Sequence, residues 1–544
     1  MFRILLVFSL LAVTRTQTST YFYPGVPTAE PISGKYTGVY RPRVHFSPPA
    51  NFMNDPSGLF RDKDGVFHLY YQYNPTQTVA GNQHWGHATS KDLYHWQNQK
   101  IALWPPTKST YVYTGSAVLD VNNTSGFFPG QDNGVVAIYT LAAYENGTGG
   151  TQDQNIAYSR DGGYTFEAYK GNPIINVNST NFRDPKVLWH TETGKWVMVV
   201  SFSADFIIGI YTSLDLKNWT HASNFSHHGL VGMAYECPNL IEMPMEGDDR
   251  TMWVLQISVN PGAPLGGSVS QYFVGNFNGT HFIPVDGVTR LTDFSKDNYA
   301  GQFFYGIPAT EKQISFGWAS NWQYTDLVPT GNTEGWRSQM SVPRYQYLAN
   351  VTAIGYNMFS APYNIQSIFS QELAYNKSFG NGTILIDYST VASGALYVEA
   401  NVTGLTASTL QGMINMTFIS SVSGEFVAVG SPLDSDTWVN RGHTYAFENP
   451  YFTNKFSTAA QYSGDGTWSV AAIIDHSILE VFLNGGQHAA TTTFYAKHSL
   501  DNLRIDTSGM YSNVSVSIGV WALEDAWAME ANSNGTVVGN VTHI

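Results

Sequence analysis

Three acidic residues stand close to prolines in similar local contexts. They are Asp55-Pro56, Asp184-Pro185 and Glu236-Cys237-Pro238. An apolar residue follows each motif, and about a dozen residues later comes a run of aromatic and β-branched residues that reads as a strand. Paired carboxyl groups perform glycoside hydrolysis, in which one attacks the anomeric carbon and the other protonates the leaving group. The alternative is structural, because Asp-Pro-Ser-Gly is also a favourable turn sequence.

The acids belong to a longer repeat that suggests how they are brought together. A second element, Ser90-x-Asp92-x-x-x-Trp96, recurs as Ser213-x-Asp215-x-x-x-Trp219. Units starting near 55, 115, 184, 236 and 300 have a period of roughly 50–70 residues, which is typical of a propeller. The first strand of each blade lines the central channel of such a fold. We therefore expect Asp55, Asp184 and Glu236 to face one another across that channel.

Strand patterns along the whole chain predict an all-β protein. Helical periodicity is scarce, and short strands are separated by Gly, Pro, Asn and Asp. The repeat predicts a five-bladed β-propeller over residues 36–350, followed by a linker over 351–375. Evenly spaced alternating strands such as Ala395-Leu-Tyr-Val-Glu399 then predict a C-terminal β-sandwich over 376–544.

Composition narrows the classes of partner. The net charge is −14, which argues against nucleic acid, since phosphate binding needs a basic surface. Aromatic residues make up 14% of the chain, which suits both a β-rich core and stacking against sugar rings. The single cysteine, Cys237, excludes an intrachain disulfide. Its thiol is either a nucleophile or, more simply, a small apolar group beside Glu236.

Neither a metal site nor a cofactor is expected. His84-x-x-His87 and His227-His228 would point to opposite faces of a strand, so neither pair chelates readily. The sequence contains no phosphate-binding loop, dinucleotide fingerprint or zinc-protease motif.

The N-terminus and the sequons point to secretion. A basic start followed by the apolar run Ile4–Val13 predicts a signal peptide over residues 1–20, the alternative being an ordinary buried segment. Asn-x-Ser/Thr sequons include Asn123, Asn178, Asn278 and Asn415. No later apolar stretch is long enough to span a membrane. We expect a secreted glycoprotein with no membrane association after cleavage, the cell wall and the periplasmic space being alternative locations.

From about Val44 to its C-terminus the chain resembles the β-fructofuranosidases of glycoside hydrolase family 32, and most closely the yeast and fungal invertases. The motifs that carry the resemblance are ordered along the chain. They are Asn54-Asp55-Pro56, Trp85-Gly-His-Ala88, Arg183-Asp184-Pro185, Glu236-Cys237-Pro238, Asn260-Pro-Gly-Ala-Pro264, Gln271-Tyr-Phe-Val-Gly275, Trp318-Ala-Ser-Asn-Trp322 and Glu448-Asn-Pro-Tyr-Phe-Thr-Asn454.

The resemblance implies the roles of individual residues. Asp55 is the nucleophile, Glu236 the general acid/base, and Asp184 with Arg183 holds fructose hydroxyls and stabilises the transition state. The substrate-binding residues implied are Asn54, Gln72, Trp85, Tyr113, Thr114, Arg183 and Trp318. Plain core packing is the alternative for the aromatic members. The implied substrates are sucrose and fructo-oligosaccharides, and the sandwich either binds glycan or forms a homodimer interface.

The sequence departs from the family pattern beside the nucleophile. The usual Trp-Met-Asn-Asp-Pro-Asn-Gly has Phe52 in place of Trp and Ser57 in place of the second Asn, and the usual Phe-Ser-Gly-Ser reads Tyr113-Thr-Gly-Ser116. These changes leave the reaction type intact and bear on the balance between hydrolysis and fructosyl transfer. The alternatives are a dedicated fructosyltransferase, an exo-inulinase, or a protein that only binds glycans.

Overall fold

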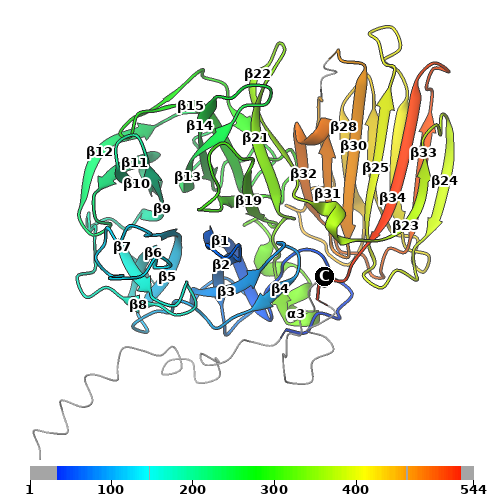
Figure 1. Cartoon of the computed structure of the whole chain (residues 1–544). Helices are drawn as coiled ribbons and strands as arrows, with labels where there is room; N and C mark the ends of the chain where they lie inside the picture. The colour runs from blue at the N-terminus through cyan, green and yellow to red at the C-terminus, as the bar shows by residue number, and fades with distance from the viewer. Residues whose placement is uncertain (1–33, 146–147, 461–463, 528–544) are drawn as a thin grey trace, which may run out of the picture.

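The computed structural model describes residues 34–145, 148–460 and 464–527. The expected signal peptide over residues 1–20 lies outside these described residues. The all-β prediction is confirmed, since strands form a propeller and a sandwich that stand side by side (Figure 1). Within the described ranges, no helix is long and apolar enough to cross a membrane.

Five antiparallel sheets form the propeller, and the first strand of each contacts the first strands of neighbouring sheets around the channel. These inner strands are β1 (Asn51–Arg61), β5 (Thr110–Leu119), β9 (Phe182–His190), β13 (Tyr235–Pro244) and β18 (Tyr299–Phe303). Their positions match the starts expected from the repeat.

The outer strands complete each blade in chain order. In the first two blades they are β2 (Phe67–Asn74), β3 (His84–Ser90) and β4 (Trp96–Asn98), then β6 (Val135–Glu145), β7 (Thr148–Ser159) and β8 (Glu167–Ala168). In the third and fourth they are β10 (Lys195–Phe202), β11 (Ile207–Ser213) and β12 (Trp219–Ser226), then β14 (Thr251–Val259), β15 (Val269–Phe277), β16 (Phe282–Pro284) and β17 (Arg290–Leu291). The fifth has β19 (Gln313–Trp318), β21 (Arg344–Val351) and β22 (Gly355–Pro362).

The ring is closed by a segment that leaves the fifth blade. After β19 the chain forms η2 (Thr325–Leu327) and α3 (Thr330–Glu334), and then β20 (Trp336–Arg337) pairs in parallel with β1 of the first blade. The first and fifth blades are therefore joined beside the strand that carries Asp55.

The Ser-x-Asp-x-x-x-Trp element is a turn between the third and fourth strands of a blade. Ser90 Oγ accepts from the backbone N–H of Leu93 (2.8 Å), and Asp92 Oδ1 accepts from the N–H of His95 (2.8 Å). Trp96 Nε1 then donates to the carbonyl of Leu93 (2.9 Å). The copy at 213–219 repeats the Asp and Trp bonds, which explains why the sequence pattern recurs.

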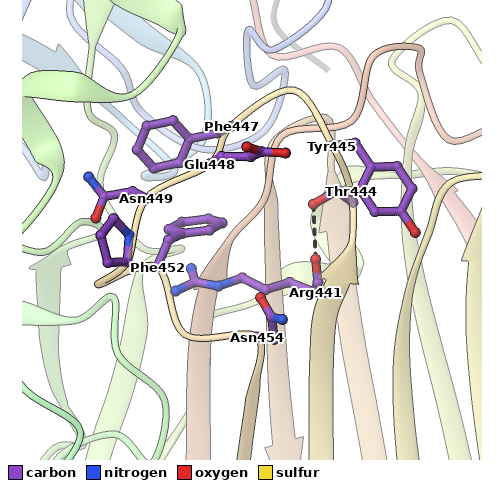
Figure 2. A pocket seen from close by; sticks show the side chains of 10 residues that line it. Arg441, Thr444, Tyr445, Phe447, Glu448, Asn449, Phe452 and Asn454 are labelled. Carbon is purple, nitrogen blue, oxygen red and sulfur yellow. Dashed lines mark hydrogen bonds between the residues drawn. The ribbon is translucent and has the colours of Figure 1, made fainter.

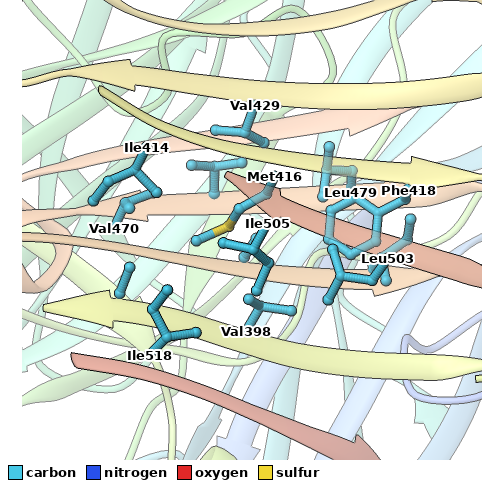
Figure 3. Packing of buried hydrophobic residues seen from close by; sticks show 14 of the residues in the cluster. Val398, Ile414, Met416, Phe418, Val429, Val470, Leu479, Leu503, Ile505 and Ile518 are labelled. Carbon is cyan, nitrogen blue, oxygen red and sulfur yellow. The ribbon is translucent and has the colours of Figure 1, made fainter. Parts of the chain in front are cut away.

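The sandwich consists of two six-stranded sheets that face each other across an aliphatic core (Figure 3). One sheet contains β23 (Phe369–Asn376), β34 (Ser515–Leu523), β25 (Ala395–Thr403), β30 (Thr467–Asp475), β31 (Ile478–Leu483) and β32 (His488–Thr493). The other contains β24 (Gly382–Asp387), β33 (Asn502–Ser508), β26 (Met413–Ile419), β27 (Phe426–Pro432), β28 (Thr437–His443) and β29 (Lys455–Thr458). Alternate residues of each strand point inward, as sheet packing requires.

The structure corrects the prediction of a linker over residues 351–375. Within it, β22 is the outermost strand of the fifth blade and β23 pairs with β34 of the sandwich. The connection is reduced to the short stretch around η3 (Ile365–Ile368). The Tyr- and Asn-rich composition concealed a strand, because β22 lies at a blade edge and buries only Met358, Ser360 and Ala361.

A cluster of buried charges joins the two domains. His45 Nδ1 lies 2.8 Å from Asp475 Oδ2, and its Nε2 lies 3.4 Å from Glu480 Oε1. Arg344 of the fifth blade pairs with Glu480 (2.7 Å) and lies 3.4 Å from Asp293. We call these five residues the interface cluster.

Candidate active site

All five inner strands carry a β-bulge at the same level of the channel. In each, two consecutive residues oppose a single residue of the second strand. The bulged pairs are Asn54-Asp55, Tyr113-Thr114, Asp184-Pro185, Cys237-Pro238 and Ala300-Gly301. Bulges redirect side chains next to active sites, and here they turn one ring of residues toward a common point.

The three acids occupy successive positions relative to the bulge. Glu236 directly precedes its bulge, Asp184 is the first bulged residue of its strand, and Asp55 is the second. The backbone has a positive φ at Asp184 (67°) and at Cys237 (46°), a conformation that is uncommon for residues other than Gly. Local strain of this kind clusters at functional sites.

Asp55 is buried and its carboxylate is held from two sides. Thr114 Oγ1 donates to Asp55 Oδ2 (3.0 Å), and Cys237 Sγ lies 3.4 Å from the same oxygen. Asp55 Oδ1 has no hydrogen-bond partner among the described residues. One oxygen is therefore fixed while the other remains available to a ligand.

Asp184 and Glu236 are linked through Arg183 and Cys237. Cys237 donates its backbone N–H to Asp184 Oδ2 (3.0 Å), and its sulfur lies 3.6 Å from that oxygen. Arg183 donates to Glu236 Oε1 from Nε (3.1 Å) and Nη2 (2.7 Å), and its Nε lies 4.0 Å from Asp184 Oδ2. We call Asp55, Asp184, Glu236 and Arg183 the channel cluster.

Burial and mutual repulsion raise the pKa of two acids in the channel cluster. Burial raises the pKa of Asp55 to about 6, helped by the charge of Glu236, although hydrogen bonds from Asn54, Thr114 and Cys237 oppose the shift. Burial also raises the pKa of Asp184 to about 7; Arg183 lowers it, and the two neighbouring carboxylates raise it. Three acids around one arginine cannot all ionise without a free-energy cost.

Cys237 serves the channel cluster as a donor. Burial and the charges of Asp184, Asp55 and Glu236 raise the pKa of its thiol well above the ordinary value, so the thiol keeps its proton. A nucleophilic thiolate is thus disfavoured, and the sulfur instead bridges two carboxylates.

Tyr299, Gln152 and Ser203 also contact the channel cluster, and sequence reasoning missed all three. Tyr299 donates its hydroxyl to Glu236 Oε2 (2.5 Å), while Gln152 Oε1 and Ser203 Oγ accept from Arg183 at 3.3 and 2.7 Å. Tyr299 directly precedes its bulge, which is the position that Glu236 occupies in the fourth blade. Aligning the five blade starts residue by residue would have found it.

The expected substrate-binding residues divide into two groups. Asn54 Oδ1, Gln72 Nε2 and Trp318 Nε1 are buried polar atoms without a hydrogen-bond partner in the described chain, and Gln72 opposes the Asn54-Asp55 bulge. Such atoms need a partner, which a ligand could supply. Trp85 Nε1 instead donates to the carbonyl of Tyr113 (3.0 Å), and its ring lies fully inside a hydrophobic cluster. Trp85 therefore packs as a core residue in this structure, and its role in substrate binding stays a prediction.

Tyr113 and Thr114 form the bulge of the second blade. Thr114 contacts Asp55 directly, as described above. The half-buried Tyr113 shares a hydrogen bond with the hydroxyl of Tyr144 (2.9 Å). Of this pair, only Thr114 makes a hydrogen bond to the nucleophile position.

A separate cavity of about 550 Å³ lies in the sandwich (Figure 2). Its described lining residues are Arg441, Gly442, Thr444, Tyr445, Phe447, Glu448, Asn449, Pro450, Phe452 and Asn454. Glu448 is the single acid among them, and Arg441 is already engaged with Asp297 (2.6 Å). This cavity lacks the paired carboxyl groups of the channel and does not offer the same chemistry.

Comparison with known proteins identifies close relatives along both domains. Residues 45–357 match the N-terminal domain of glycosyl hydrolases family 32, and residues 348–522 match its C-terminal domain. An invertase of Debaryomyces hansenii is 42% identical over 492 residues, covering 85% of this chain and 89% of that protein. An extracellular exo-inulinase of Meyerozyma guilliermondii is 40% identical over 488 residues, covering 86% and 92%. The β-fructofuranosidase of Schwanniomyces occidentalis, solved with fructosyl-erythritol, superposes with a TM-score of 0.81 at 36% identity, covering 92% and 99%.

Proposed function

This chain belongs to glycosyl hydrolases family 32, and we propose that it is a retaining β-fructofuranosidase that hydrolyses sucrose and short fructans. The observation that carries the proposal is the convergence of Asp55, Asp184 and Glu236 on one point of the channel, where they share Arg183 and Cys237. Glycoside hydrolysis explains why repelling carboxyl groups are gathered there.

In the proposed reaction Asp55 and Glu236 act in two steps. Asp55 attacks the anomeric carbon of the fructosyl unit while Glu236 gives its proton to the departing glucosyl oxygen, leaving a covalent fructosyl ester. Glu236 then takes a proton from water as the water oxygen attacks the same carbon, which releases fructose and restores Asp55. Each step inverts the carbon, so the overall configuration is retained.

Asp184 and Arg183 are assigned to binding and transition-state stabilisation. Arg183 is fixed by Gln152 and Ser203, so its guanidinium is preorganised beside both Asp184 and Glu236. Asn54, Gln72 and Trp318 supply the unpartnered polar atoms that suit sugar hydroxyls. Thr114 orients Asp55, and we add Tyr299 as a partner that orients Glu236.

Stereochemistry tests the nucleophile. With sucrose as donor and methanol as acceptor, we expect methyl β-fructofuranoside, identified by NMR of the early product. The α-anomer would remove Asp55 from its role, because a single displacement inverts the carbon.

The acid–base assignment predicts a bell-shaped pH profile on the acidic side of neutrality. Asp55 must be ionised, and its raised pKa places the acidic limb above the range of an ordinary carboxyl. The alkaline limb reports the group that gives its proton to the leaving oxygen. An optimum well above neutrality, measured as kcat/KM for sucrose, would contradict Glu236 as the donor.

An exo-inulinase is the second candidate, because an extracellular exo-inulinase is as similar to the chain as the invertases are. It would use the same carboxyl groups and differ in its preference for longer chains. Timed separation of the sugars released from sucrose and from inulin distinguishes the two. Oligosaccharides formed from concentrated sucrose would show the fructosyl transfer that we also propose.

We further propose that the protein is secreted, glycosylated and dimeric through the sandwich. Secretion accords with the extracellular relative and with the sequons. Asn178 and Asn278 are exposed, whereas Asn415 lies half-buried in β26. Mass spectrometry of glycopeptides should therefore find glycan on the first two in preference to Asn415, and light scattering should give the mass of a dimer.

A further inference from the structure

A layer of buried polar residues lies directly below the channel cluster. It consists of one residue from each inner strand, one or two positions after the bulge: Ser57, Ser116, Lys186, Asn239 and Gln302. We call it the channel layer. All five are at most 4% exposed, so they are core positions of the propeller that carry polar groups in place of aliphatic ones.

Hydrogen bonds from three members of the channel layer connect the second, third and fifth blades in a closed triangle. Lys186 of the third blade donates from Nζ to the carbonyl of Phe303 in the fifth (2.6 Å). Gln302 of the fifth blade donates from Nε2 to the carbonyl of Gly115 in the second (3.0 Å). Ser116 of the second blade donates to the carbonyl of Pro185 in the third (2.9 Å).

The corners of this triangle are β5, β9 and β18, of which β9 bears Asp184 and the other two carry residues that contact Asp55 and Glu236. Gly115 follows Thr114, which contacts Asp55, and Pro185 follows Asp184. Phe303 is four residues beyond Tyr299 on β18, and Tyr299 contacts Glu236. Displacing any corner would move a group that touches a catalytic carboxyl.

Burying the amine of Lys186 at this position has a free-energy cost. It makes no ion pair with a carboxylate of the described residues, and burial lowers its pKa to about 7. A buried amine with one carbonyl partner destabilises a fold compared with an apolar side chain of similar length. Stability therefore does not explain why a lysine stands here. The need for a side chain long enough to link the third blade to the fifth across the channel does explain it.

We infer that Lys186, together with Gln302 and Ser116, is a positioning residue that sets the spacing of the second, third and fifth inner strands, which carry Asp184 and the groups that contact Asp55 and Glu236. The inference rests on the proposed function, because it concerns the same carboxyl groups. These residues do not touch the substrate and act through the backbone of the strands that do.

The experiment compares Lys186→Met with a matched control, Lys217→Met. Lys217 also donates from Nζ to a carbonyl at 2.6 Å, that of Ser125, at the periphery of the propeller. We expect Lys186→Met to lower kcat on sucrose roughly 10–100-fold, because a misplacement of about 1 Å has effects of this size, while KM stays within about threefold. Lys217→Met should keep kcat within about twofold of wild type, whatever its melting temperature.

Two further variants keep the inference testable if Lys186→Met does not fold. Ser116→Ala and Gln302→Met each remove one side of the triangle, and each should lower kcat by roughly two- to tenfold with little change in KM. The double variant should lose less than the product of the single losses, because the triangle is already open. Folded variants with wild-type kcat would overturn the inference. Wild-type protein that fails to cleave sucrose would instead overturn the proposed function.

Discussion

The channel cluster and the interface cluster are both charged and largely buried, yet the pKa values of Asp55 and Asp184 in the first shift in the opposite direction to those of Asp475 and Glu480 in the second. In the channel cluster Arg183 contacts Glu236 and lies 4.0 Å from Asp184, and the pKa values of Asp55 and Asp184 are raised. In the interface cluster, hydrogen bonds and the charges of Arg344 and His45 outweigh burial and hold the pKa values of Asp475 and Glu480 below their usual range, whereas burial raises the pKa of Asp293.

Histidine protonation makes the contrast clearer. Hydrogen bonds and the charges of Asp475 and Glu480 overcome burial and raise the pKa of His45 to about 9, so the interface cluster keeps two cations at neutral pH. Its acids also accept backbone N–H groups, such as that of Val342 onto Glu480 (2.7 Å). Asp55, by contrast, has an oxygen with no partner among the described residues. The acids that join the domains are held by cations and backbone N–H groups, whereas Asp55 keeps one oxygen without a partner in the described residues.

The largest effect should come from removing charge from the channel cluster. Asp55→Asn and Glu236→Gln should each lower sucrose hydrolysis by several orders of magnitude, because neither role has a substitute. Asp184→Asn should cost ~10²–10³-fold as a lost transition-state contact. Steady-state kinetics on protein with wild-type circular dichroism is the measurement, and near-normal turnover by any one variant would withdraw its assignment.

Removing one charge from the interface cluster should have the converse effect. Glu480→Gln leaves Arg344 and His45 short of a buried partner, so we expect the free energy of unfolding to fall by about 3–5 kcal/mol. Turnover at 25 °C should stay near wild type. Asp506→Asn, which breaks an exposed pair with Arg504, is the control and should not change urea unfolding measurably. A large loss of turnover in folded Glu480→Gln would show that the two clusters are coupled.

A pH series should show that substitutions in the two clusters change the free energy of unfolding in opposite directions. The pKa of Asp55 rises from 3.8 to about 6 on folding, so its ionisation destabilises the fold above that range by up to about 3 kcal/mol. Asp55→Asn should therefore be more stable than wild type at pH 7, and the gain should vanish as the pH falls toward 4. Glu480 has a lowered pKa and stabilises the fold above its unfolded pKa, so Glu480→Gln should be less stable at pH 7, with the difference shrinking in acid. Calorimetry of both variants at several pH values is the measurement. Stability changes of the same sign in the two variants at pH 7 would refute the comparison.

The sequence predicted the fold and the convergence of the three acids because both leave local, repeated signals, while the roles of the acids stay a prediction. Acid–proline motifs marked the inner strands, and the Ser-x-Asp-x-x-x-Trp element marked the blade turns. The three acids nevertheless occupy three different positions relative to their bulges, which only strand pairing reveals.

What the sequence did not predict depends on contacts between distant segments. Tyr299 reaches Glu236 from 63 residues away, and Lys186 reaches Phe303 from 117. The interface cluster joins His45 to Asp475, 430 residues apart. No local pattern marks Phe303 or Asp475 as such a partner, and only an alignment of the blade starts could have marked Tyr299. The linker was mistaken for coil because a blade-edge strand buries too few residues to show a clear alternation.

The smallest effect concerns two neighbours of the channel cluster, Phe52 and Ser57, where the usual family residues are Trp and Asn. Phe52 is buried against Cys237, Tyr299 and Trp318, and Cys237 contacts Asp55. Ser57 is fully buried, and its hydroxyl has no hydrogen-bond partner in the described chain. Neither side chain offers the N–H donor that the usual residue would bring beside the nucleophile.

Those missing donors should shift how the fructosyl ester is divided between water and a sugar acceptor. A lost hydrogen bond is worth about 0.5–1.5 kcal/mol, which corresponds to a several-fold change in partitioning. We expect appreciable oligosaccharide synthesis at high sucrose, and a lower transfer-to-hydrolysis ratio in Phe52→Trp and Ser57→Asn, measured by chromatography of early products. Phe52→Trp adds volume to a packed cluster, so its melting temperature must be measured alongside. A ratio that stays the same or rises in stable variants would show that these two positions do not control transfer, while the channel cluster would keep its role in hydrolysis.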